Sequence, residues 1–271
     1  MSLLIIIILG IVEGVTEFLP VSSTGHLILA GHFLGLPEAD ATFDIVIQLG
    51  AILAIVVLYW HRFLGVGVGL LRRDPGAIAF TRNVLLGFLP AGIVGALAYG
   101  AIRRVLEAPG IAVVVVAVAL LVGGVLILLI ERTAPPARVH NVEGLRWPTA
   151  LAIGLVQCLS MIPGVSRSGA TIMGARALGV DQKTAAEYSF FLAVPTMMGA
   201  TTLALWKARH DLDTSHLSAI AIGFAVSFVV ALLVVRWFIG VVTRRGFAPF
   251  AWYRIVAGAL ALVLYYAGVH A

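Results

Sequence analysis

The chain has 271 residues, of which 61% are hydrophobic and only 11% are charged, and its formal net charge is +5. A soluble domain carries about a quarter charged residues, so this composition excludes a water-soluble globular protein and indicates a surface covered by lipid. The basic residues lie in short segments between apolar runs, which fits membrane orientation and excludes a nucleic-acid-binding face. A single cysteine, Cys158, excludes an intramolecular disulfide and a cysteine-based metal site.

The first apolar segment, residues 3–36, carries two acidic side chains. Glu13 and Glu17 share one face of a predicted helix, and two like charges within a bilayer repel one another. A divalent cation between them would relieve this repulsion, and carboxylates together with phosphate oxygens suit Mg²⁺ or Ca²⁺. The alternative is a pair at the membrane surface that is only hydrated.

The same segment is interrupted at Pro20, where the first helix is expected to end. Ser22, Ser23 and Thr24 follow, at the position where the next helix begins. Hydroxyl side chains there are either ordinary N-caps or reactive groups. His26 comes next and can act as an acid, a base or a nucleophile.

Six further stretches are apolar and of about the 20 residues that a membrane-spanning helix needs. They are residues 43–60, 84–102, 111–130, 188–206, 217–239 and 252–269. If each interrupted segment returns to the side from which it entered, three arginine-containing loops fall on one side of the membrane. These loops are residues 61–82, 131–147 and 240–254, and the positive-inside rule assigns them to the cytoplasm. The first interruption then opens to the outside, as do both termini.

A second interrupted segment covers residues 148–180 and breaks at Pro163. Arg167 lies there between Ser166 and Ser168, at another predicted helix start. Free backbone N–H groups at a helix N-terminus, together with an arginine, form a phosphate-binding cradle. A structural ion pair between Arg167 and a glutamate of the first segment is an alternative that is compatible with this role. Carboxylates and nucleophiles in one segment and an anion clamp in the other suit phosphoryl transfer.

The two interrupted segments also resemble one another. A shift of 144 residues overlays GIVEGVTEFLPVSSTGHLI on GLVQCLSMIPGVSRSGATI and places Ser22 on Ser166. Chance similarity between two turns is the alternative to duplication. A broken segment plus three spans makes an odd number of crossings, so the second copy is expected to be inverted, as in many transporters. The prediction is an all-α polytopic membrane protein with one membrane domain, 1–271, and two inverted-topology repeats, about 1–135 and 145–271. Each repeat consists of a re-entrant broken-helix segment plus three transmembrane helices.

The stretches EGVTEFLPVSSTGHL and PGVSRSGAT closely resemble the signature motifs of the bacterial undecaprenyl pyrophosphate phosphatase family, which is linked to bacitracin resistance. The resemblance extends over essentially the whole chain, and neither motif departs from the family pattern. It implies hydrolysis of undecaprenyl pyrophosphate to the monophosphate, which recycles the lipid carrier for peptidoglycan. It also implies dependence on a divalent cation and a multi-pass protein of the bacterial inner membrane whose site faces the periplasm.

The resemblance further implies roles for individual residues. Ser23 is the expected nucleophile, with His26 as the competing candidate; Glu17 and His26 would assist proton transfer, and Glu13 and Glu17 would hold Mg²⁺ or Ca²⁺. The catalytic set also includes Arg167. The expected phosphate-binding residues are Ser22, Thr24, Ser166, Arg167, Ser168 and Thr171. The expected partners are the lipid substrate and membrane lipid, without nucleic acid, and the oligomeric state stays open between a monomer and a homodimer.

Two other functions compete with this one. Lipid phosphatases of the acid-phosphatase type place a histidine after a Ser-Arg pair and five intervening residues, but this chain has Met173 there, so that pattern fails. A polyprenyl-phosphate transporter that uses the same anion site is the other, and the sequence leaves it open.

Overall fold

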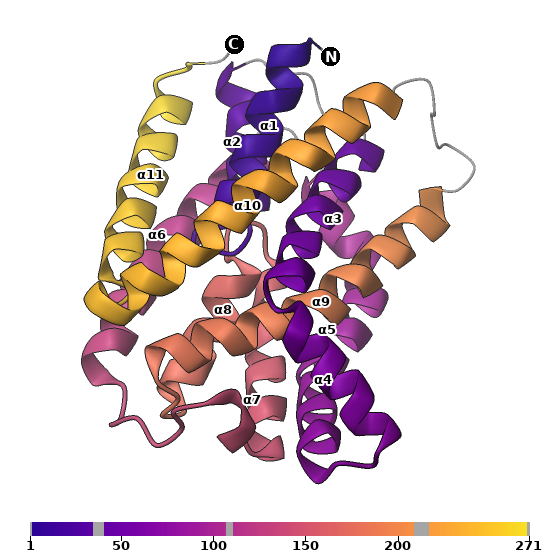
Figure 1. Ribbon diagram of the computed structural model, residues 1–271. Helices are drawn as coiled ribbons and strands as arrows, with labels where there is room; N and C mark the ends of the chain where they lie inside the picture. Colours follow the sequence, from indigo (N-terminus) through magenta and orange to yellow (C-terminus); the bar gives the residue numbers. More distant parts are fainter. Residues whose placement is uncertain (1, 35–40, 107–110, 209–216, 270–271) are drawn as a thin grey trace.

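The computed structural model describes residues 2–34, 41–106, 111–208 and 217–269, and these form eleven α-helices and two short 3-10 helices. The α-helices are α1 (Leu3–Thr16), α2 (Ser23–Leu34), α3 (Ala41–Leu58), α4 (Trp60–Leu71), α5 (Pro75–Leu106), α6 (Ile111–Thr133), α7 (Trp147–Gln157), α8 (Arg167–Ala177), α9 (Gln182–Ala208), α10 (Leu217–Arg245) and α11 (Ala248–Tyr266). The 3-10 helices are η1 (Val142–Gly144) and η2 (Cys158–Met161). Figure 1 shows α10 crossing the front of the molecule and both chain termini at one end. The predicted all-helical fold is confirmed.

Four helical stretches in the described part of the chain are long and apolar enough to cross a membrane. They are Pro75–Ala98, Ile111–Thr133, Ser218–Arg245 and Ala248–Tyr266. A fifth is the bent pair Phe43–Leu58 and Trp60–Leu71. Each of these overlaps a span predicted from the sequence, so the multi-pass membrane character is confirmed. The inverted relation of the two halves stays a prediction.

One predicted feature differs from the structure. At the end of the first predicted span, residues 43–60, the chain bends by 72° at Tyr59, whose backbone leaves the helical conformation, and it then continues as helix α4. The predicted loop 61–82 is therefore mostly helical. The predicted span 188–206 lies within α9, which is not among the spans found in the described residues, and Ser189 and Phe190 of this helix are fully buried.

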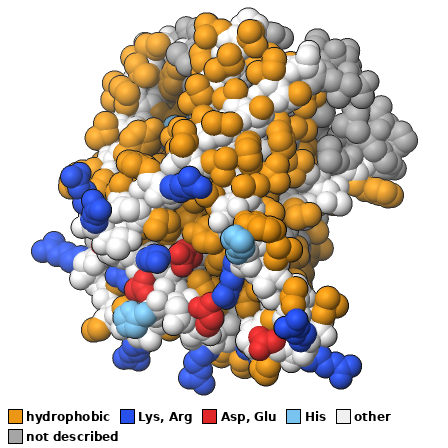
Figure 2. Space-filling model, viewed as in Figure 1, with side chains coloured by type: hydrophobic (Ala, Val, Ile, Leu, Met, Phe, Trp, Pro, Cys, Tyr) orange, Lys and Arg blue, Asp and Glu red, His pale blue; other side chains and the backbone are white. Residues whose placement is uncertain are grey.

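The surface separates apolar and charged regions. Figure 2 shows hydrophobic side chains over the upper half of the visible face, while charged side chains gather over the lower half. Large apolar side chains such as Leu97, Leu233 and Val263 are more than half exposed. In water this exposure would be unfavourable, but hydrocarbon solvates these groups without cost. The distribution supports a lipid-covered upper region and a polar lower end.

Helices α6 and α11 pack backbone against backbone through glycines. A Cβ atom added at Gly258 would lie 2.6 Å from the carbonyl oxygen of Ala117, and one at Gly124 would lie 2.7 Å from that of Ala251. Both distances are too short for a real Cβ contact. Small residues at such a crossing let membrane helices approach closely and gain van der Waals contact.

We expect Gly258→Ala to destabilise the protein by roughly 1–3 kcal/mol, because the added methyl group must separate the two helices. The matched control is Gly67→Ala on the exposed face of α4, where a Cβ meets nothing within 4 Å. Unfolding of the purified protein by denaturant in detergent measures both effects. Equal loss of stability in the two variants would contradict the close packing.

Candidate active site

Both predicted helix breaks are present, and they share one local geometry. Ser22 precedes α2 and Ser166 precedes α8, and both have a positive φ, 73° and 79°. Each serine Oγ accepts a hydrogen bond from the backbone N–H three residues later, from Gly25 at 3.3 Å and from Gly169 at 3.0 Å. A left-handed serine costs about 1–3 kcal/mol and is typical of functional sites. The breaks therefore hold two helix starts in a strained but capped conformation.

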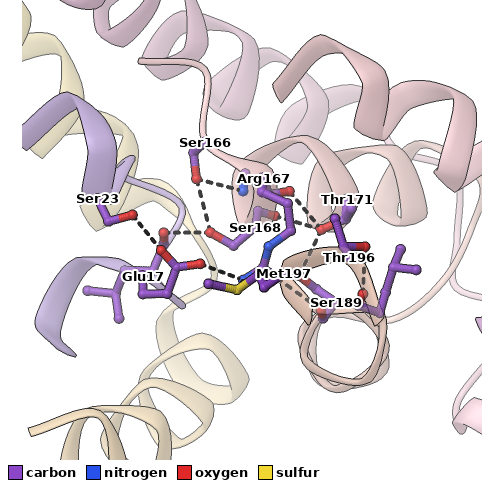
Figure 3. A network of polar contacts seen from close by, with 12 residues as sticks. Glu17, Ser23, Ser166, Arg167, Ser168, Thr171, Ser189, Thr196 and Met197 are labelled. Carbon is purple, nitrogen blue, oxygen red and sulfur yellow. Dashed lines mark hydrogen bonds and ion pairs between the residues drawn. The ribbon is translucent and has the colours of Figure 1, made fainter. Parts of the chain in front are cut away.

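A chain of charged hydrogen bonds joins the two breaks (Figure 3). Ser23 Oγ donates to Glu17 Oε2 at 2.5 Å, and Arg167 Nη2 donates to Glu17 Oε1 at 2.9 Å. The Glu17 and Arg167 side chains are only 7% and 11% exposed, which strengthens the ion pair between them. Glu17 is thus oriented by an arginine from the other half of the chain and contacts a serine hydroxyl. This arrangement can remove a proton from Ser23 and hold an anion beside it.

Helix α9 fixes the arginine from its other side. Arg167 Nη1 donates to the carbonyl oxygen of Ser189 at 3.1 Å and to its Oγ at 3.4 Å, and Nη2 lies 3.5 Å from Met197 Sδ. Figure 3 shows both Ser189 and Met197 next to the end of the Arg167 side chain. Ser189 was not among the site residues predicted from the sequence. Its only signal was a hydroxyl within the apolar run that follows Glu187.

A cavity of about 510 Å³, the central cavity, opens beside this polar chain. Its polar wall comes from both breaks and consists of Glu17, Ser22, Ser23, Thr24, Ser166 and Arg167. Its apolar wall comes largely from α5 and α9 and includes Phe88, Ala91 and Leu203. A cavity that is charged on one side and apolar on the other suits a ligand with an anionic head and a hydrocarbon chain.

Glu13 lies outside this chain of hydrogen bonds. It is fully buried, and neither of its carboxylate oxygens accepts a hydrogen bond from a described residue. Glu17 and Asp44 lie close enough to repel its charge. A buried carboxylate without a donor is costly unless a cation or a proton compensates it. Glu13 is therefore suited to a cation, although no cluster of three or more acidic, histidine or cysteine side chains occurs among the described residues.

His26 turns away from the central cavity. Its Nδ1 lies 2.8 Å from the carbonyl oxygen of Ser22, and its Nε2 lies 2.6 Å from the hydroxyl of Tyr253, whose ring stacks on the imidazole. His26 is not among the residues that line the cavity. Its contacts fit support of the first turn of α2 more directly than proton transfer at Ser23.

Ser168 and Thr171, which were predicted to bind phosphate, are fully buried and bonded to the protein itself. Ser168 Oγ donates to the carbonyl oxygen of Leu19 at 2.6 Å, and Thr171 Oγ1 lies 2.7 Å from Ser189 Oγ. Neither side chain lines the central cavity. Ser168 thereby ties the second break to the first, and Thr171 ties α8 to α9.

Arg254 belongs to the segment 240–254 that was predicted to be a cytoplasmic loop, and for this residue the prediction of a loop is wrong. It lies within α11, is 1% exposed, and donates five hydrogen bonds to backbone carbonyl oxygens. The acceptors are Pro20 of the first break, Gly164 and Val165 of the second, and Ala119 and Leu120 of α6. The carbonyl groups of Pro20, Gly164 and Val165 are available as acceptors because the helices are broken there. Arg254 thus holds both breaks against α6.

We expect Arg254→Met to lower the stability by roughly 3 kcal/mol or more, since several buried carbonyl groups lose their donor. Arg254→Lys keeps a charge and three donors, so its melting temperature should fall between those of the wild type and Arg254→Met. Arg73→Met, at an exposed position, is the control. Thermal unfolding in detergent measures the order of the variants. A melting temperature of Arg254→Met equal to that of the control would exclude the proposed anchoring role.

Comparison with known proteins extends the similarity to the whole chain. Residues 6–260 match the family model described as bacitracin resistance protein BacA. An undecaprenyl-diphosphatase of Rhizorhabdus wittichii is 68% identical over 263 residues, 97% of each chain. An undecaprenyl-diphosphatase of Sphingopyxis alaskensis is 62% identical over 259 residues, 95% of this chain and 96% of the relative. One from a Caulobacter strain is 51% identical over 264 residues, 97% of each chain.

Proposed function

The chain belongs to the BacA family of bacitracin resistance proteins, and we propose that it hydrolyses undecaprenyl pyrophosphate to undecaprenyl phosphate and inorganic phosphate. This reaction recycles the lipid carrier of peptidoglycan synthesis. One structural observation carries the proposal: Ser23 and Arg167, from opposite halves of the chain, both bond to Glu17 at a cavity with a polar and an apolar wall. The polar wall suits the diphosphate and the apolar wall suits the first part of the polyprenyl chain.

Ser23 acts as the nucleophile in this proposal. Because its Oγ already donates to Glu17, the carboxylate can take the proton as the oxygen attacks the terminal phosphorus. The bond from that phosphorus to the bridging oxygen breaks, Glu17 passes its proton to the departing undecaprenyl phosphate, and the phosphoryl group stays on Ser23. Water then attacks the phosphoserine and Glu17 accepts a proton from the water. This proton moves to Ser23 Oγ as the bond from the phosphorus to Oγ breaks and inorganic phosphate leaves.

Arg167 holds the phosphoryl oxygens during both steps. Its guanidinium already lines the cavity, so it can exchange its bond to Glu17 for bonds to the substrate while Ser189 keeps its orientation. The exchange also frees Glu17 to act as the base. The N-termini of α2 and α8 add backbone N–H groups, which favour negative charge at that place. Ser22, Thr24 and Ser166 complete the polar wall.

A divalent cation, Mg²⁺ or Ca²⁺, is the proposed cofactor. Glu13 and Glu17 would hold it, and the buried Glu13 carboxylate, which lacks a donor among the described residues, supports this assignment. The cation would supply positive charge to the diphosphate. Glu17 contributes only in part, because both of its oxygens already accept hydrogen bonds from Ser23 and Arg167.

We also propose that the central cavity opens to the periplasm and that the two halves are inverted repeats. The arginines of residues 61–82, 131–147 and 240–245 support the orientation by the positive-inside rule. The shared geometry of Ser22 and Ser166, at positions that the sequence overlay pairs, supports the duplication. Cysteine labelling of introduced residues from each side of sealed vesicles tests the orientation.

The decisive experiment measures phosphate release by the purified protein in detergent. With undecaprenyl pyrophosphate and Mg²⁺ the protein should release inorganic phosphate, and Ser23→Ala protein purified in parallel should not. A wild-type protein that releases none, yet moves polyprenyl phosphate across liposome membranes, would replace the enzyme with a transporter.

A further inference from the structure

A second hollow of about 790 Å³, here called the arginine groove, lies between α1, α10 and α11. Arg236, Arg244 and Arg245 of α10 line it. The other walls are mainly apolar and include Leu19 and Phe250. Figure 2 shows Lys and Arg side chains over the lower half of α10, next to hydrophobic surface. The groove combines a cationic rim with an apolar interior.

None of the three arginines forms an ion pair or side-chain hydrogen bond with a described residue, and all three are exposed. Arg244 and Arg245 lie in the last turn of α10, where the helix dipole alone would favour them. Arg236 lies two turns earlier, so the dipole does not explain its place. Arg236 and Arg244 share a helix face with Gly240 between them, and a Cβ at Gly240 would meet nothing within 4 Å. The glycine thus leaves open space between two cationic side chains.

We propose that the arginine groove is a second lipid-binding site that takes the monophosphate head of a polyprenyl phosphate. Three unpaired guanidinium groups match a phosphomonoester, with about −1.5 to −2 charge at pH 7, better than a singly charged phosphodiester. The apolar walls accept the adjoining part of the chain. The lipid class is that of the product of the proposed reaction, so the identity of the chain rests on that proposal.

The first break separates the arginine groove from the central cavity. Thr16, Leu19 and Val21 face the groove, whereas Glu17, Ser22 and Ser23 line the cavity. The two hollows therefore contact different residues of one segment.

Tyr253 also lines the groove, and its hydroxyl bonds to His26, which contacts the carbonyl of Ser22. Occupancy of the groove is thus linked through three residues to the break that carries Ser23.

The test measures binding of geranylgeranyl monophosphate to the full-length protein in detergent by native mass spectrometry. The Arg167→Ala substitution weakens lipid binding in the central cavity. In this background, the lipid that remains bound therefore reports binding in the arginine groove. Replacing Arg236, Arg244 and Arg245 by glutamine should weaken this binding by roughly tenfold for each arginine. Gly240→Leu places an isobutyl group in the groove at a position where a Cβ meets nothing within 4 Å, and it should also weaken binding at least tenfold, while Gly67→Leu on α4 should not.

Two results would overturn the proposal. One is binding in the glutamine and Gly240→Leu variants that equals that of the Arg167→Ala parent. The other is phosphatidylglycerol binding as tightly as the monophosphate, because the arginines would then form a general anionic-lipid surface. Phosphate release by the wild type is measured separately, so failure of the enzyme proposal is distinguished from failure of the groove proposal.

Discussion

Arg167→Ala is expected to lower kcat/KM for undecaprenyl pyrophosphate by about 10³-fold or more, the effect of losing an arginine that stabilises phosphoryl-transfer charge. Among the described residues that line the central cavity, Arg167 is the only cationic side chain, so no neighbouring cation replaces it. Arg167→Lys should recover only part of the activity, because an ammonium group cannot make the paired, planar contacts of a guanidinium. Phosphate release at several substrate concentrations measures the loss.

Loss of the ion pair complicates this result, since Arg167→Ala leaves the Glu17 charge buried without its partner. Removal of one partner of a buried pair costs about 3–5 kcal/mol. The double variant Arg167→Met/Glu17→Gln removes both charges and should regain stability without regaining activity. Arg73→Ala, at an exposed position, is the control for arginine removal. A stable Arg167→Ala protein with near-normal turnover would reject the phosphate-binding role.

The breaks were predictable because they depend on local chemistry. Helix α1 ends at Thr16, four residues before Pro20, where the end was predicted. Serines capable of capping precede both α2 and α8, so the break positions followed from residue types to within a few positions. The pairing of Arg167 with a glutamate was one of the alternatives predicted from the sequence, because an isolated arginine in an apolar segment needs an anion. These predictions required no knowledge of how distant helices pack.

The roles of Arg254 and His26 depend on partners that are distant in the sequence, so local motifs could not predict them. The five carbonyl groups around Arg254 come from residues 20, 119, 120, 164 and 165, which meet only in the folded chain. From the sequence alone, an arginine at the boundary of an apolar stretch is assigned to a loop, because the acceptors that surround it are known only from the fold. The direction of His26 is likewise set by Tyr253, 227 residues away. Side-chain roles that depend on such long-range partners could not follow from motif spacing.

Ser23→Ala and His26→Ala together decide the nucleophile, and their expected effects differ widely. Ser23→Ala should reduce turnover by roughly 10³-fold or more while substrate binding persists, since Arg167 still holds the phosphate. His26→Ala should cost only about tenfold, because its ring bonds to Ser22 and Tyr253 rather than to Ser23. Tyr253→Phe, which removes the partner hydroxyl, should match or fall short of that smaller loss.

Acid quenching with substrate labelled in its terminal phosphate provides a direct readout, since phosphoserine survives acid whereas phosphohistidine does not. The label should remain on the wild-type and His26→Ala proteins and be absent from Ser23→Ala. An active Ser23→Ala protein beside an inactive His26→Ala protein would move the nucleophile to His26. The imidazole would then have to leave Tyr253 and enter the central cavity. The short Ser23–Glu17 contact makes the serine the expected nucleophile, because it needs no such rearrangement before the proton is transferred.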